Sequence, residues 1–314
     1  MKRICITGGN GLLGTKLARV LKGVGDVISI DRHAKNRTES THVEYVQGDI
    51  TDEERIGNII VSGRCDMIIH TAAMTDVDGR EESPEKAYEV NVCGTENVAK
   101  AADAVGARLV HLSTDYIFNG ADGPYREEDN PDPVSVYGRT KLESEAVVRK
   151  VCRNHLVVRT MVLYGYAPHL RKNFVTWLIE KLAHKEPVRI VTDQYGTATP
   201  AEELAGAIGA LLEQNLRGTY NAAGREVLNR YEFSQIIASV FGLDSSLISA
   251  TTSKEFKQKA ARPKKSGLVC DKLERDTGYR FSPLRKALAR MKDEMDWQHY
   301  SPHSNDGDRD RKQG

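Results

Sequence analysis

Residues 1–31 read MKRICITGGNGLLGTKLARVLKGVGDVISID, and this stretch decides the fold. A short β-rich run, Arg3–Thr7, ends in glycines, and apolar residues then recur at the spacing of a helix. A second apolar run, Val27–Ile30, ends at the carboxylate of Asp31. Strand, glycine turn, helix, strand and acid stand in the order of a βαβ unit that binds a dinucleotide. The sequence therefore predicts an α/β fold with a doubly wound parallel sheet of the Rossmann type.

The glycines of the turn follow the pattern Gly8-x-x-Gly11-x-x-Gly14. Because glycine has no Cβ, the backbone can turn sharply, and a pyrophosphate can approach the N–H groups at the helix N-terminus, where the dipole favours negative charge. A P-loop is excluded because Lys16 follows a threonine, which reverses the order that a P-loop needs. We predict that this turn holds the pyrophosphate and that Asp31 lies beside the adenosine ribose.

The charge balance argues against large charged partners. The 314 residues include 45 basic and 44 acidic side chains, so no overall field attracts nucleic acid or an anionic membrane. No apolar run approaches the roughly 18 residues that span a bilayer, and the N-terminal apolar run is interrupted by glycine, unlike a signal peptide. We therefore expect a cytoplasmic protein whose partner is a small molecule. The oligomeric state stays open, with a homodimer as the candidate.

Cysteine and histidine usage gives two further expectations. The five cysteines lie far apart without a CxxC pair, which predicts reduced, mostly buried thiols. The nine histidines show no ligand spacing, so we expect no metal site.

The loop after Asp31 gives conflicting signals on the cofactor. Asp31 favours NAD, because a carboxylate bonds the ribose hydroxyls and repels a 2′-phosphate. Arg32, Lys35 and Arg37 offer cations that can accept that phosphate, although Lys35 and Arg37 also fit a solvated charge run. The choice between NADH and NADPH therefore stays open.

Two further strands end in residues suited to the cofactor. Val43–Val46 leads to Asp49 and Ile50, and the Asp49 carboxylate is placed either to reach the adenine amino group or to cap the helix whose N-cap we expect at Thr51. Asp66–His70 leads into Thr71–Thr75, where mostly small residues let ribose and phosphates lie against backbone. We predict cofactor contacts from both strand ends.

A long helix is predicted from Ser83 to Val105, with Pro84 as its first internal residue and Gly106 as its stop. Asn91 lies within it, on a face that is otherwise largely apolar. Because asparagine is unfavourable inside helices, we expect either a bridging hydrogen bond near the active site or an exposed position.

A strand and a helix bring candidate catalytic side chains to the same edge. The strand Arg108–Leu112 delivers Thr114 to the carboxyl edge of the sheet, where ligands bind in such folds. Tyr137 and Lys141 then stand at i and i+4 of a helix, on one face, and we expect Leu142, Ala146 and Val147 to face inward.

The pair suits proton transfer. A free tyrosine has a pKa of about 10, and an adjacent ammonium and a nicotinamide cation would lower the pKa of Tyr137. Lys141 would also hold the ribose hydroxyls, and Thr114 would orient the substrate oxygen. The alternative for Tyr-x-x-x-Lys alone is a solvated helix face.

These motifs resemble the extended short-chain dehydrogenase/reductases, and most closely the dTDP-4-dehydrorhamnose reductases. The resemblance reaches to about Trp297. It implies that Thr114, Tyr137 and Lys141 are catalytic, and that Thr114 and Asp115 contact the sugar. Its further motifs are Ser113–Phe118, Val157–Thr160, Asn173–Phe174, Asp193–Thr199 and Ala261–Leu268. The cofactor residues expected are Gly8, Gly11, Leu12, Leu13, Gly14, Asp31, Arg32, Asp49, Ile50, Ala72, Ala73, Met74, Thr75, Tyr137 and Lys141, and the substrate residues are Thr114, Asp115, Asn173 and Arg262.

The chain departs from that family at three positions and differs from a related family at a fourth. Many of these reductases carry glutamine at Leu12, proline at Ala198, and at Val162 a tryptophan near the sugar, so the identity of the sugar stays open. In the related 4,6-dehydratases a glutamate follows the Thr-Asp pair, where this chain has Tyr116. That difference argues against dehydration.

The regular alternation of strand and helix stops after Arg159, which suggests a second lobe. We expect a dinucleotide-binding domain over residues 1–160, a partly interleaved sugar-nucleotide lobe over 161–298, and a disordered polar tail over 299–314. In the second lobe, Arg262 would meet diphosphate oxygens. The elements predicted there are helices at 173–184, 200–212, 231–241 and 284–295, and strands at 188–191 and 218–221.

The resemblance implies an oxidoreductase. It would pass a hydride from NADPH or NADH to the C4 ketone of a dTDP-linked 4-keto-6-deoxyhexose, as in dTDP-L-rhamnose biosynthesis, while Tyr137 protonates the oxygen. Two alternatives stay open. One is a non-catalytic, dinucleotide-binding regulatory subunit that resembles the β subunit of methionine adenosyltransferase. The other is an epimerase or a reductase of another nucleotide sugar.

Overall fold

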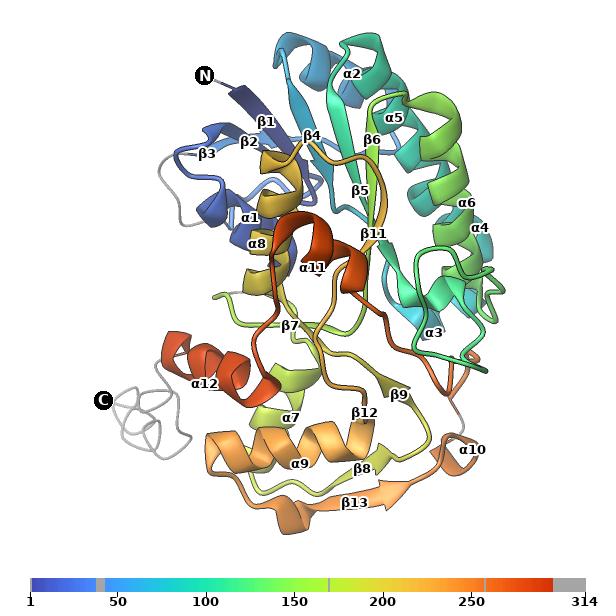
Figure 1. Cartoon of the computed structure of the whole chain (residues 1–314), viewed down its shortest axis with the longest axis vertical. Helices are drawn as coiled ribbons and strands as arrows, with labels where there is room; N and C mark the ends of the chain where they lie inside the picture. Colours follow the sequence, from blue (N-terminus) through green and yellow to red (C-terminus); the bar gives the residue numbers. More distant parts are fainter. Residues whose placement is uncertain (1, 38–42, 169, 257, 296–314) are drawn as a thin grey trace, which may run out of the picture.

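A seven-stranded sheet forms the centre of the molecule (Figure 1). The computed structural model describes residues 2–37, 43–168, 170–256 and 258–295. The strand order is β11-β6-β5-β4-β1-β2-β3, and every pair of neighbours is parallel. The predicted doubly wound parallel sheet is confirmed. Its strands are β1 (Lys2–Thr7), β2 (Gly25–Asp31), β3 (Val43–Gln47), β4 (Met67–His70), β5 (Arg108–Thr114), β6 (His155–Thr160) and β11 (Gly218–Asn221).

Helices cover both faces of this sheet, because successive side chains of each buried strand point to opposite faces. In β1, Ile4 and Ile6 join the cluster formed with α1 and α8, whereas Cys5 joins the cluster formed with α2, α5 and α6. The apolar stripes of these helices therefore define two buried layers. The helices are α1 (Leu12–Val20), α2 (Glu53–Ser62), α5 (Gly94–Ala104), α6 (Val136–Val151) and α8 (Ala201–Glu213).

A smaller lobe lies below the sheet in Figure 1 and has a core of its own. In this lobe α7 (Phe174–Ala183) packs against α9 (Arg230–Phe241), and α9 packs against the parallel pair β8 (Val188–Val191) and β13 (Ile248–Thr251). The remaining elements are β7 (Leu163–Tyr164), β9 (Tyr195–Gly196), β10 (Thr199–Pro200), β12 (Leu228–Asn229), η3 (Ser245–Leu247), α10 (Ser253–Phe256) and α12 (Leu284–Glu294).

The chain passes between the lobes several times. After β7 to β10 it returns to the sheet, where α8 packs on α1 and β11 pairs with β6. A short helix, α11 (Asp271–Thr277), also contacts α8 and β11. The edge strand of the sheet therefore comes from the second half of the chain. The tail predicted to be disordered, 299–314, lies outside the described residues.

The helix predicted from Ser83 to Val105 is confirmed, and it contains one turn of a different type. It consists of α4 (Pro84–Tyr88), a π-helical turn η1 (Glu89–Cys93) and α5. The π turn carries Asn91, whose Oδ1 accepts from the Met74 N–H (2.8 Å) and whose Nδ2 donates to Thr140 Oγ1 (3.1 Å). The bridging hydrogen bond expected of Asn91 is confirmed. An extra residue in one turn aims the side chain out of the regular ladder, a common use of π turns.

Two local predictions are wrong. The N-cap of α2 is Asp52 rather than Thr51, because the Asp52 carboxylate accepts from the Arg55 N–H at 3.0 Å. The five cysteines are not all reduced. Cys5 in β1 and Cys65 just before β4 form a disulfide, which adjacent strands allow with a Cα–Cα separation of 6.1 Å. Cys93, Cys152 and Cys270 carry free thiols.

The inward face of α6 also differs from the prediction. Leu142 and Val147 are only half-buried and Ala146 is exposed. The side chains that face the sheet are mostly polar, because hydrogen bonds and an ion pair compensate their burial. They are Tyr137, Lys141, Ser144, Glu145 and Val148.

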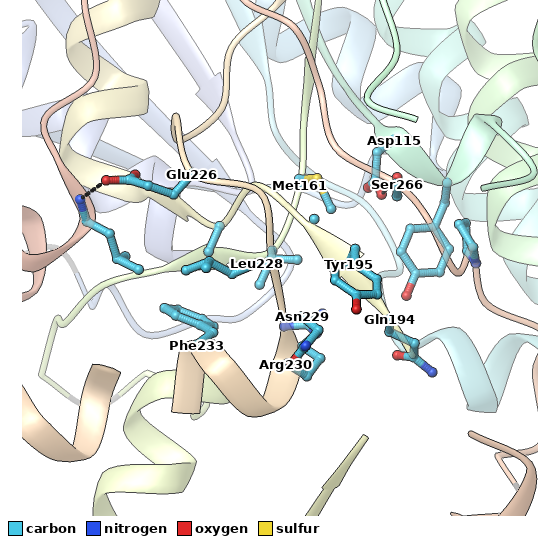
Figure 2. Close-up of a pocket in the computed structure, with 16 residues that line it drawn as sticks. Asp115, Met161, Gln194, Tyr195, Glu226, Leu228, Asn229, Arg230, Phe233 and Ser266 are labelled. Carbon is cyan, nitrogen blue, oxygen red and sulfur yellow. Dashed lines mark hydrogen bonds between the residues drawn. The ribbon is translucent and has the colours of Figure 1, made fainter. Parts of the chain in front are cut away.

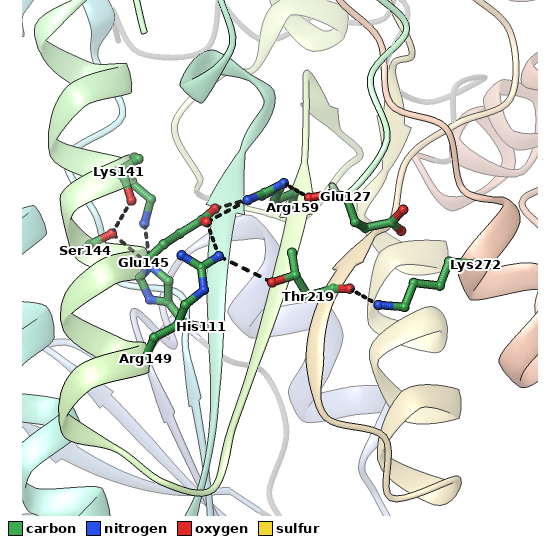
Figure 3. A network of polar contacts seen from close by, with 9 residues as sticks. All are labelled: His111, Glu127, Lys141, Ser144, Glu145, Arg149, Arg159, Thr219 and Lys272. Carbon is green, nitrogen blue, oxygen red and sulfur yellow. Dashed lines mark hydrogen bonds and ion pairs between the residues drawn. The ribbon is translucent and has the colours of Figure 1, made fainter. Parts of the chain in front are cut away.

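One buried ion pair fixes α6 to the sheet (Figure 3). Arg159 in β6 donates from Nε to Glu145 Oε1 and from Nη2 to Oε2, each at 2.9 Å. Both side chains are at most 4% exposed. Burial alone would raise the pKa of Glu145, but the hydrogen bonds and charge of Arg159 lower it overall. The bidentate geometry compensates two desolvated charges.

We predict that Arg159→Met lowers the free energy of unfolding by about 3 kcal/mol, because it leaves the Glu145 carboxylate buried without its main partner. Urea denaturation at neutral pH measures the loss. The control is Arg153→Met, which removes a pair with Asp103 from an arginine side chain that is 88% exposed. It should change the value by less than about 0.5 kcal/mol. Equal losses in the two variants would contradict this account.

Candidate active site

The glycine turn between β1 and α1 is tightly packed. A Cβ on Gly14 would lie 2.5 Å from the Gly8 carbonyl oxygen and 2.7 Å from Gly9, and Gly8 has a φ of +71°. Only glycine fits these two positions without strain. Gly11 is the N-cap of α1 and, having no side chain, caps no N–H. The turn therefore presents backbone donors at a helix N-terminus, which suits a pyrophosphate.

A large crevice opens at the carboxyl ends of the strands, as expected for this fold. Its volume is about 800 Å³. It brings together most of the predicted site residues. Those lining it are Gly8, Gly11, Leu12, Leu13, Asp31, Arg32, Asp49, Ile50, Ala72, Ala73, Met74, Thr75, Thr114, Asp115, Tyr137, Lys141 and Asn173. Gly14 and Arg262 are not in its lining.

The end of the crevice next to β2 and β3 suits an adenosine. Asp31 accepts from the Asn10 N–H (3.2 Å) and from the His33 N–H (3.1 Å), which fixes its carboxylate at the rim. Asp49 accepts from the Thr51 N–H (3.0 Å) and hydroxyl (2.9 Å), so in this structure it closes a turn before α2 while lining the crevice. Arg32 is exposed beside Asp31, so an acidic and a basic side chain lie at the same end of the crevice.

The three candidate catalytic side chains meet at the floor of the crevice. Thr114 ends β5, and Tyr137 and Lys141 lie on the buried face of α6, with exposed fractions of 6%, 9% and 3%. The Tyr137 hydroxyl shares a hydrogen bond with Thr114. The solvated-face alternative for the Tyr-x-x-x-Lys pair is therefore excluded.

Local packing explains this placement. Ser135 caps α6 by accepting from the Gly138 N–H at 3.1 Å. A Cβ on Gly138 would lie 2.1 Å from the carbonyl oxygen of Tyr116, which belongs to the 3-10 turn η2 (Asp115–Ile117) after β5. Glycine at this position lets the first turn of α6 approach the end of β5, and so brings Tyr137 to Thr114.

Burial dominates the electrostatics of the floor. It raises the pKa of Tyr137, and the hydrogen bond with Thr114 opposes this rise only in part. In the protein itself, desolvation of the phenolate outweighs the other contributions. The lowering that we expect from an ammonium together with a nicotinamide cation stays a prediction. Burial lowers the pKa of Lys141 to about 8. The phenol thus stays protonated at neutral pH, as a proton donor must.

The substrate side of the crevice is built by both lobes. Asp115 is 1% exposed and accepts from Ser266 Oγ of the second lobe (2.7 Å) and from Thr114 Oγ1 (3.1 Å). Burial raises the pKa of its carboxyl to about 6. Asn173 lines the crevice, but its Oδ1 caps α7 by accepting from the N–H groups of Val175 and Thr176.

Arg262 has a different environment from the one expected. Its guanidinium forms a bidentate pair with Asp78, at 3.0 and 2.7 Å. Asp78 lies in α3 (Val77–Glu82), so this pair joins the second lobe to the first. A guanidinium can form bidentate hydrogen bonds with a diphosphate or with a carboxylate. The sequence alone cannot show which of the two partners Arg262 has.

Sequence reasoning missed Arg230, the first residue of α9. It lines the crevice and also a smaller cavity (Figure 2), and its guanidinium lies 5.0 Å from the centre of the Phe174 ring. The labelled side chains that line this cavity include Asp115 just after β5, Met161 just after β6, Tyr195 of β9, Leu228 of β12 and Phe233 of α9. Arg230 follows a helix cap at Asn229 and belongs to no motif, so no local signal marked it.

Comparisons with known proteins agree with the geometry. The family model described as "RmlD substrate binding domain" matches residues 1–297. The protein named "Probable low-salt glycan biosynthesis reductase Agl14" from Haloferax volcanii is 34% identical over 91% of this chain and 96% of its own length. "Methionine adenosyltransferase 2 subunit beta" from Bos taurus is 32% identical over 87% of this chain and 82% of its own.

A solved structure extends the comparison to the fold. The dTDP-4-dehydrorhamnose reductase from Bacillus anthracis, in complex with NADP, is 31% identical and superposes with a TM-score of 0.82. The match covers 94% of this chain and 100% of that one. Among the described residues we find no helix that combines the length and apolarity needed to cross a bilayer.

The pKa of Asp115 gives a test of its burial. Because the pKa of the folded protein, about 6, lies above the free value of about 3.9, the stability that the neutral carboxyl contributes below pH 4 is lost as pH rises through 6. We predict that Asp115→Asn raises the free energy of unfolding, relative to wild type, by about 2 kcal/mol more at pH 7.5 than at pH 4.

Urea denaturation at the two pH values measures this difference. Asp122→Asn, at an exposed position, is the control and should change the free energy of unfolding by less than about 0.5 kcal/mol at either pH. A pH-independent effect of Asp115→Asn would show that its carboxylate is not desolvated as described.

Proposed function

The chain belongs to the RmlD substrate binding domain family of extended short-chain dehydrogenase/reductases, and from this we propose that it reduces the C4 ketone of a dTDP-linked 4-keto-6-deoxyhexose. It is an NAD(P)H-dependent oxidoreductase that acts on a nucleotide sugar. The observation that carries the proposal is the meeting of Thr114, Tyr137 and Lys141 at the floor of the crevice.

The dinucleotide would lie along the crevice. The glycine turn would hold the pyrophosphate, Asp31 and Arg32 the adenosine ribose, and Asp49 with Ile50 the adenine. Residues 72–75 would lie along the second ribose, whose hydroxyls Lys141 would hold. The bound dinucleotide supplies the hydride.

Three side chains would then serve the ketone. Thr114 would exchange its hydrogen bond to Asp115 for one to the ketone oxygen, and would so orient that oxygen toward Tyr137. Tyr137 gives its proton to that oxygen as negative charge develops there. The raised pKa of Tyr137 keeps the phenol protonated, and the cation of Lys141 stabilises the phenolate that forms.

The sugar would lie between the lobes, at Asp115 and Asn173. Arg262 can bind the diphosphate only if it exchanges its pair with Asp78, and Arg230 adds a cation that the sequence motifs did not include. Tyr116 stands where a dehydratase has its acid, which supports reduction over dehydration. One relative is named a glycan biosynthesis reductase, which supports the alternative that the substrate is another nucleotide sugar.

A regulatory subunit is the second candidate. The bovine methionine adenosyltransferase β subunit is 32% identical to this chain, and the reductase of known structure is 31% identical. Such a subunit needs no assembled proton donor. The buried and hydrogen-bonded Tyr137 supports the enzymatic alternative.

We predict that purified protein oxidises NADPH in the presence of dTDP-4-keto-L-rhamnose, and that Tyr137→Phe lowers kcat by about 100-fold or more, because the ketone oxygen loses its proton donor. Loss of nicotinamide absorbance measures turnover. The dissociation constant of NADPH should change by less than about twofold, since binding does not require the proton.

Tyr88→Phe is the matched control, because it removes a hydroxyl from a tyrosine that is 47% exposed. Its kcat should equal that of wild type. The reductase proposal fails if wild type and Tyr137→Phe are equally inactive. NADPH binding without turnover, together with co-purification of a methionine adenosyltransferase, would instead support the regulatory subunit.

A further inference from the structure

Two histidines lie inside the sheet beneath the crevice, where apolar side chains are the rule. His70 ends β4 and His111 lies in β5. They are 1% and 0% exposed, and their rings stack with centroids 5.4 Å apart. His70 is fully paired, with Nδ1 at 2.7 Å from Thr7 Oγ1 and Nε2 at 3.0 Å from Thr95 Oγ1. A buried polar ring without such partners would cost stability, so the contacts of His111 need an explanation.

His111 has polar contacts at one ring nitrogen, and that nitrogen faces α6 (Figure 3). Its Nε2 lies 3.3 Å from Lys141 Nζ and 2.9 Å from Ser144 Oγ. Its Nδ1 has no hydrogen-bond partner in the described part of the chain. Two side chains from successive turns of the catalytic helix therefore converge on a single imidazole nitrogen.

The charges around His111 keep its ring neutral. Burial lowers its pKa well below the usual value, and the charges of Lys141, His70 and Arg149 lower it further. Lys141 and Arg149 face the ring from α6, and His70 faces it from β4. Glu145, the acid nearest to Lys141 on α6, is paired with Arg159 of β6. A neutral imidazole can offer one lone pair to a donor.

The position of the ring proton is linked to the charge of Lys141. An ammonium only donates, so a charged Lys141 requires an unprotonated Nε2 and a proton on Nδ1. When Nε2 carries the proton, it donates to Ser144 Oγ instead, which is available because the Ser144 hydroxyl donates to the Lys141 carbonyl oxygen (2.7 Å). The first state leaves the Nδ1 donor without a partner, and the charge-assisted hydrogen bond from Lys141 compensates this cost. Where Lys141 carries no charge, the second state is favoured, since an orphaned donor is costlier than an orphaned acceptor.

We propose that His111 is a positioning residue for the reaction. It accepts a hydrogen bond from the Lys141 ammonium and holds this cation beneath the ribose and Tyr137. The inference rests on the proposed function only for what Lys141 then does. Lys141 is 3% exposed, and burial disfavours its charge, so a neutral acceptor at 3.3 Å keeps the cation where the crevice needs it.

The tautomer of His111 gives a test that needs neither cofactor nor substrate. Long-range nitrogen–proton NMR of histidine-labelled wild-type protein at neutral pH should show Nδ1 protonated and Nε2 unprotonated. In Lys141→Met the proton should move to Nε2, because only Ser144 remains as its partner. A protonated Nε2 in the wild type would overturn the proposal. The same tautomer in the wild type and in Lys141→Met would also overturn it.

A pair of variants then tests the effect on the cofactor site. In His111→Gln the amide reaches the position of Nε2, whereas in His111→Asn it ends near Nδ1 and cannot reach Lys141. We measure the dissociation constant of NADPH by fluorescence as a function of pH. Affinity in the wild type should fall as pH rises through the pKa of Lys141, about 8, since the neutral amine binds the ribose less well.

The midpoint of this fall should move down by about one pH unit in His111→Asn and stay near the wild-type value in His111→Gln, because a hydrogen bond to a charged group raises its pKa by about that much. His70→Asn is the matched control for loss of a buried imidazole and should leave the midpoint unchanged. Equal midpoints in all variants would assign His111 a purely structural role. Sound NADPH binding with the expected shifts, but without ketone reduction, would reject the proposed function and keep the role of His111.

Discussion

The structure depends on the burial of a polar helix face. The side chains that α6 turns toward the sheet include a phenol, an ammonium and a carboxylate, and desolvation of such groups opposes folding unless partners compensate it. Arg159 compensates Glu145, Thr114 pairs with Tyr137, and His111 contacts Lys141. Each partner belongs to β5 or β6, so these two strands and the helix can pack in only one register. The catalytic geometry and the stability of the domain thus rest on the same contacts.

The second lobe completes the site by reaching back to the first. Ser266 donates to Asp115 next to the catalytic floor, and Arg262 pairs with Asp78 in α3. Both contacts come from one short segment, residues 262–266, which they hold against the first lobe. The Arg262 pair occupies a guanidinium that could also bind a diphosphate.

Much of this arrangement could be predicted from local patterns. The glycine turn, the strand ends and the Tyr-x-x-x-Lys pair were recognisable because backbone geometry restricts the residues allowed there. The buried face of α6 could not be predicted in this way. Leu142 and Ala146 are apolar and Glu145 is charged, so hydrophobicity alone favours burial of the wrong residues. What decides their places is an arginine from a strand that is distant in sequence. The same holds for the π turn at Asn91, the disulfide between Cys5 and Cys65, and the cavity position of Arg230, all of which depend on neighbours that no window of sequence contains.

The edge strand β11 comes late in the sequence, which affects how the sheet can form during translation. This strand pairs with β6 at the sheet edge, although the chain builds β7 to β10 and α8 in between. A nascent chain that has emerged only as far as residue 160 lacks both this strand and the helix that covers α1. Until α8 and β11 have left the ribosome, its β6 edge stays unpaired on one side, and one face of its sheet is covered by α1 without α8. Most residues that line the crevice are therefore translated early. The lining is complete only after most of the second lobe has been translated.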